Sequence, residues 1–118
     1  MKKLVNIIDA TKEAVEGLVR NIRVMPADRL TWQPEPTTRT ALDLFQECAG
    51  APGMFAGVLR ERMSQPMTPD TFQKMREERQ AWKSVDEIEA ALRSRSEDFY
   101  AAVLAVPEAD MDVEVEMP

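Results

Sequence analysis

The feature that most constrains the fold is a helical repeat of apolar residues in three long segments. In the segment at about 4–24, apolar positions recur at alternating spacings of four and three, the period of one face of an amphipathic helix. The segments at about 40–63 and 84–105 carry the same pattern. The first stripe consists of Leu4, Ile8, Thr11, Val15, Leu18, Ile22 and Met25. The three segments predict an all-α, up-down helical bundle.

Capping residues and prolines set the ends of these segments. Pro26 disfavours helix at the residue before it, so the first helix should end near residue 24. Thr40 is typical of a helix N-cap, and Ser84 with Glu87 forms a capping box for the third long helix. Pro107 should stop that helix near residue 105.

The middle segment contains Pro52 among several small residues. We expect one kinked helix across it, because the apolar stripe stays in phase on both sides of the proline. Gly50, Gly53 and Gly57 would let a neighbouring helix approach closely. The alternative is a small apolar-ligand site in a gap beside Pro52. A phosphate loop is disfavoured because the strand–loop–helix context is missing.

The segments that connect and follow the long helices show less apolar periodicity. Residues 25–39 form a proline-rich loop, in which we expect Trp32 to fold back onto the core. Residues 69–78 form a short helix with Pro69 in its first turn. Residues 112–117 alternate polar and apolar, and we expect a packed extended C-terminal tail. The whole of 1–118 should be a single helical-bundle domain, at a length typical of one domain.

The second and third long segments hold more apolar residues than one buried stripe needs. Three helices alone would leave some of these positions exposed, so a fourth helix or another chain should cover them. The extra positions are Leu44, Cys48, Phe55, Val58, Tyr100 and Leu104.

Composition excludes several kinds of site. With no histidine and one cysteine, the chain can form no Ser-His-Asp triad, no His/Cys zinc finger and no internal disulfide. The formal net charge is −6, and most of it falls on residues 107–118. The nearly neutral remainder argues against nucleic acid. The longest uncharged stretch, Cys48–Leu59, is too short to span a membrane, so we expect a cytoplasmic protein.

Two motifs point to a family. The first helix leads to the sequence MPADRLTWQP (residues 25–34), and the second begins RTALDLFQECA (residues 39–49). This combination resembles the DinB/YfiT-like superfamily of four-helix bundles, and the Ser84-capped helix and residues 113–118 also fit. The resemblance spans nearly the whole chain, although its motifs are short.

The resemblance implies a divalent metal held by three histidines, one on the second helix and two on the fourth, and in some members hydrolase, thiol-transferase or isomerase activity. Here Glu47 matches the second-helix histidine, which makes it the one candidate metal ligand. The family's fourth helix would begin where this sequence stops. We expect either a C-terminally shortened chain or a natural protein without that helix, and the excess apolar positions favour the first.

The functional expectations follow from these departures. We expect no catalytic residue and no cofactor in the chain as given, with Glu47 more simply a salt-bridged surface residue. Cys48 should be a buried, inert thiol. The favoured hypothesis is a non-catalytic binding protein without bound metal, acting as a homodimer. The alternative is a metal-dependent hydrolase or thiol transferase whose site is completed by a missing C-terminal helix or a second chain.

Overall fold

The computed structural model describes residues 2–61 and 68–111. Four α-helices occupy most of these residues, and no strand occurs among them: α1 (Lys2–Val24), α2 (Ala41–Glu61), α3 (Pro69–Gln80) and α4 (Val85–Leu104), with short 3-10 turns at Ala27–Arg29 and Glu108–Asp110. The all-α prediction and the three long helices are therefore confirmed. The extended tail expected at 112–117 lies outside the described residues.

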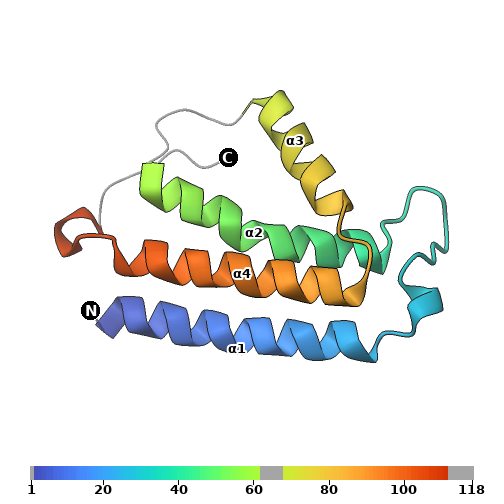
Figure 1. The fold of residues 1–118 in the computed structure, drawn as a ribbon, viewed down its shortest axis with the longest axis horizontal. Coiled ribbons are helices and arrows are strands. Elements are labelled where there is room, and N and C mark those ends of the chain that lie inside the picture. Colours follow the sequence, from blue (N-terminus) through green and yellow to red (C-terminus); the bar gives the residue numbers. More distant parts are fainter. Residues whose placement is uncertain (1, 62–67, 112–118) are drawn as a thin grey trace.

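Helix α4 lies at the centre of the molecule, with α1 along one side of it and α2 along the other (Figure 1). The larger core cluster joins all three helices and is built from Val15, Val19, Ile22, Ala49, Ile88, Ala91 and Leu92. A smaller cluster at the other end of α1 contains Leu4, Ile8, Tyr100 and Val103. The apolar stripes predicted for α1 and α4 thus supply the core.

Among the three long helices, α2 and α4 are parallel. Side-chain contacts pair Gln46 with Trp82 and Arg60 with Asp98, so α2 and α4 run in the same direction. Helix α1 is antiparallel to both (Figure 1). Successive helices still alternate in direction when α3 is counted, because α3 leads back toward the end where α2 began (Figure 1).

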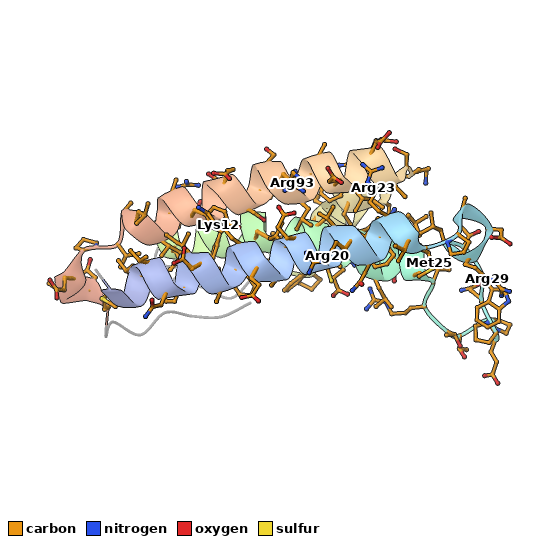
Figure 2. All side chains as sticks on the ribbon, turned by 90° about the horizontal axis from the view of Figure 1, so that it is seen from below. Lys12, Arg20, Arg23, Met25, Arg29 and Arg93 are labelled. Carbon is orange, nitrogen blue, oxygen red and sulfur yellow. The ribbon has the colours of Figure 1, made fainter. Side chains whose placement is uncertain are left out.

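A row of polar contacts lies along the edge between α1 and α4 (Figure 2). Arg93 donates to Glu16 at 2.6 Å, and Arg23 pairs with Asp86 at 2.7 Å. The hydrogen bond from Arg93 holds the pKa of the Glu16 carboxyl below its ordinary value. These exposed pairs lie along one side of α1.

Helix α2 continues through Pro52 without a break, as predicted, and its axis changes direction near the middle (Figure 1). Its buried face includes a polar residue, Gln46, whose side-chain amide donates to the Trp82 carbonyl at 2.8 Å. This bond ties the start of α2 to the turn that precedes α4.

Helix α3 is an accessory element with no buried residue. Thr68 caps it by accepting a hydrogen bond from the Thr71 amide, with Pro69 in its first turn. Its C-terminal end approaches α2, whereas its N-terminal end leans away from the bundle (Figure 1). Helix α3 therefore meets α2 at an open angle.

Trp32 does not cover the core. Its side chain is 55% exposed, and the Arg29 guanidinium lies over the indole ring at 5.6 Å. The loop anchors itself through Leu30 instead, which is buried and whose carbonyl accepts the Leu42 amide at 2.9 Å. Leu30 is thus the residue that this loop buries, and the indole of Trp32 lies on the surface.

Candidate functional site

The first candidate site is an apolar groove between α1 and α2, which we call the α1–α2 groove. Its volume is about 330 Å³, and Leu92 and Phe99 of α4 form its floor. Among the described residues that line it, none is charged. The walls include Thr11, Ala14 and Leu18 from α1 and Cys48, Ala51 and Phe55 from α2.

An apolar strip on each of α1 and α2 borders this groove. On α1 the strip runs through Ile7, Thr11, Ala14 and Leu18, and on α2 through Leu44, Cys48, Ala51 and Phe55, both at spacings of four, three and four. Residues at this spacing share one helix face. Several are large and exposed: Ile7 and Leu44 are each 45% exposed, and Phe55 is 36% exposed. The apolar excess seen in the sequence therefore includes this face.

Cys48 lies in the wall of the groove and is exposed, so the expectation of a buried thiol is wrong. Within the described residues no helix covers this side of α2. Partial burial raises the pKa of the Cys48 thiol above its ordinary value, and the negative charge of Glu47 raises it further. The thiol is accessible but is held mainly in its protonated, weakly nucleophilic form.

Glu47 lies beside Cys48 with its side chain 49% exposed and accepts a 2.6 Å ion pair from Arg39. The same guanidinium binds Asp43 at 2.5 Å. Across residues 2–61 and 68–111, no three acidic or cysteine side chains come together as a metal-ligand group. The structure thus places Glu47 in a surface ion pair and brings no further described ligand to it.

The second candidate site is a cleft bounded by α2, α3 and α4, which we call the α2–α3 cleft; it adjoins the α1–α2 groove, because Cys48, Ala51 and Phe55 line both. Its volume is about 870 Å³. Gly50, Gly53 and Gly57 line α2 here, and Met54, Phe72 and Met75 supply apolar side chains. The glycines were expected to admit a neighbouring helix or a small ligand, and the cleft lies along them.

Close packing occurs only at one end of this glycine face. A methyl group added at Gly50 would meet the Trp82 ring at 3.9 Å, and one at Gly53 would meet the Arg95 side chain at 3.2 Å. Arg95 stacks over Trp82 at 4.4 Å from the ring centre and pairs with Glu78. At Gly57 no atom of the described residues lies within 4 Å of that position, so this part of the cleft is wider.

Arg79 and Arg95, which line this cleft, were not singled out from the sequence. The run from Arg76 to Arg79 reads as a solvated helix face, and nothing in its spacing separates Arg79 from its neighbours. The structure separates them: Arg79 is half-buried and lines the cleft, whereas Arg76 is exposed. The Trp82–Arg95 contact was equally hidden, because it joins a turn to a helix.

The chain was compared with family models, curated proteins and solved structures. No family model, no curated protein and no solved structure matches the chain. In the described part of the chain, no helix has the length and apolar character needed to cross a bilayer.

Proposed function

We propose that this chain is a non-catalytic binding module of the DinB-like bundle type that works as a homodimer in the cytoplasm, with the α1–α2 groove as its dimer interface. The observation that carries the proposal is the pair of uncharged helical strips that flank the groove. Exposed contiguous apolar surface on a folded domain marks an interaction site. A twofold-symmetric dimer covers such a surface with a second copy of itself.

Small residues in and beside the α1 strip support a helix as the occupant. Ala10, Ala14 and Gly17 lie along the exposed side of α1, and such small side chains let a partner helix approach closely. On α2, Leu44 and Phe55 protrude beside the same groove. Small residues on one helix and large ones on the other give each copy both the cavity and the side chains that fill it.

The charges beside the strip support a second copy in particular. With Ile7 and Ala14 at heptad position a, Glu13 and Arg20 both fall at position g, which flanks the apolar seam. They carry opposite charges and lie two helical turns apart. An antiparallel copy of α1 therefore brings Glu13 of each chain toward Arg20 of the other, which makes the charge pattern self-complementary.

The DinB-like type rests on the sequence motifs and on the arrangement around the groove. Three long helices leave one apolar side open, which is where a four-helix bundle would place its remaining helix. In the homodimer that place is taken by the partner. The metal-dependent alternative needs ligands for Glu47 from outside the described residues, so we rank it second.

The test is the mass of the protein in solution as a function of concentration. We expect sedimentation equilibrium to show a reversible monomer–dimer transition. Ala14→Glu places a charge at the centre of the α1 strip and should shift the protein to monomer. The matched control is Ala90→Glu on the exposed face of α4, which leaves the groove untouched and should still dimerise.

Both variants should keep the circular dichroism and melting temperature of the parent monomer, because both alanines are exposed and Glu is a good helix former. A parent protein that stays monomeric at every concentration would overturn the homodimer. An Ala14→Glu variant that dimerises as well as the parent would show that another surface forms the interface.

A further inference from the structure

The α2–α3 cleft has the size and the mixed lining of a small-molecule site. Its volume of about 870 Å³ lies within the range of ligand pockets. It narrows where Trp82 and Arg95 fill the space over Gly50 and Gly53, and it opens at Gly57. The cleft is therefore closed at one end of α2 and accessible at the other.

Most charges in this cleft are already matched. Three of its four acids bind an arginine: Glu47 pairs with Arg39, Asp98 with Arg60, and Glu78 with Arg95. In each of these pairs, the charge of the acid is balanced by an arginine of the protein itself. They leave Arg79 and Glu61 as the charged lining residues to be explained.

The guanidinium of Arg79 has no acceptor among the described residues. No side-chain hydrogen bond or ion pair there involves it, and its Nε is buried from solvent. A shielded N–H donor without an acceptor is costly, and an arginine guanidinium binds carboxylates with particular strength. The Trp82 amide donates to the Arg79 carbonyl at 3.2 Å, so Arg79 lies next to the closed end of the cleft.

The rest of the lining suits an apolar chain. Met54, Phe72 and Met75 face the cleft, and Phe72 is 43% exposed although it is a large apolar residue. Methionines adapt to ligands of variable shape. Glu61 lies one helical turn beyond Gly57 at the open end, where its charge repels a second anion. The lining therefore fixes the orientation of an amphipathic anion.

We propose that the α2–α3 cleft binds a small amphipathic carboxylate, with the carboxylate on the Arg79 guanidinium and the apolar chain along the glycine face of α2 toward Gly57. Cys48, Ala51 and Phe55 line both this cleft and the groove assigned to dimerisation, whereas Arg79 and the glycine face line the cleft alone. The proposed site gives the binding module a small-molecule ligand of defined chemistry.

The test uses decanoate below its micellar concentration, with 1-decanol and decylamine as head-group controls. Trp82 reports binding by fluorescence in a Trp32→Phe background, because these are the two tryptophans of the chain. We expect saturable binding of decanoate, weaker binding of decanol by about tenfold or more, and no saturable binding of decylamine.

Two pairs of variants separate the site from the fold. Arg79→Gln should weaken decanoate binding by about tenfold or more, whereas Arg76→Gln, on the same helix but outside the cleft, should not. Gly57→Leu should block the open end, whereas Gly57→Ala should bind nearly as the parent does. Neither Gly57 change should lower the melting temperature, because glycine is a poor helix former and the position is open.

Decylamine binding as tightly as decanoate, or an Arg79→Gln variant with unchanged affinity, would overturn the proposal. The absence of saturable decanoate binding would do the same. The monomeric Ala14→Glu variant should bind decanoate as the parent does, so failure of the dimer and failure of the ligand site are distinguishable.

Discussion

At the scale of single residues, Cys48 combines two properties that a sequence does not reveal together. It is accessible in the wall of the α1–α2 groove, yet the pKa of its thiol is raised, first by partial burial and then by the neighbouring Glu47 carboxylate. Accessibility favours modification, and a raised pKa opposes it because the thiolate is the reactive form. The alkylation rate of Cys48 therefore reports both its surroundings and whether the groove is covered.

We predict that iodoacetamide modifies Cys48 more slowly at neutral pH than it modifies an unstructured cysteine peptide. The rate should rise about tenfold per pH unit until the pH passes the raised pKa, since the thiolate fraction grows in that proportion. Glu47→Gln removes the nearby negative charge and should increase the neutral-pH rate. Mass spectrometry of quenched samples measures the rate, and a rate equal to that of the peptide at every pH contradicts the prediction.

Residue-level expectations failed where they depended on neighbours distant in the sequence. Trp32 and Cys48 were expected to be buried because both are apolar, but burial depends on which helix lies opposite. Leu30 is buried and Trp32 is exposed, and the side of α2 that holds Cys48 faces the open groove. Arg79 shows the reverse case, since a charged residue in a polar run lies half-buried in a cleft.

At the scale of elements, α3 and α4 begin with similar N-caps although the two helices contribute very differently to the core. Ser84 and Glu87 form a complete capping box at the start of α4, which carries much of the core. Thr68 caps α3 with a similar hydrogen bond, but α3 buries no residue. A cap contributes to global stability only as far as its helix is coupled to the core.

We predict that Ser84→Ala lowers the free energy of unfolding by about 1 kcal/mol, the usual cost of losing an N-cap. Thr68→Ala should change it by much less, because α3 can fray without exposing buried apolar surface. Urea denaturation followed by circular dichroism measures both. Equal destabilisation by the two substitutions would show that α3 unfolds together with the bundle.

The elements themselves were largely predictable. Apolar periodicity, the caps and the prolines placed all three long helices to within a few residues, and α3 near residues 69–78. These signals are local, as is the in-phase stripe that indicated one helix across Pro52. The direction of α2 relative to α4 was not predictable from them, because it depends on the path taken after α2.

At the scale of the whole molecule, the arrangement leaves α4 covered on two sides and leaves the outer strip of α1 exposed. Arg93 and Arg23 lie at the polar edge that α1 shares with α4, whereas Arg20 lies on the outer side of α1 (Figure 2). The charged residues of α1 thus divide into those that join it to its own bundle and those available to a partner. Glu13 and Arg20 belong to the second group, and an antiparallel dimer requires that they pair across its axis.

We therefore predict that Arg20→Glu weakens the homodimer, because it replaces two unlike contacts between chains with two like-charged ones. Surface pairs contribute about 0.2–1 kcal/mol each, so the dissociation constant should rise about tenfold. Glu13→Arg combined with Arg20→Glu restores unlike charges across the axis and should return the dissociation constant close to that of the parent. Sedimentation equilibrium at low ionic strength measures all three proteins, since salt screens exposed pairs. If the double variant dimerises no better than Arg20→Glu, the two copies of α1 do not run antiparallel at this interface.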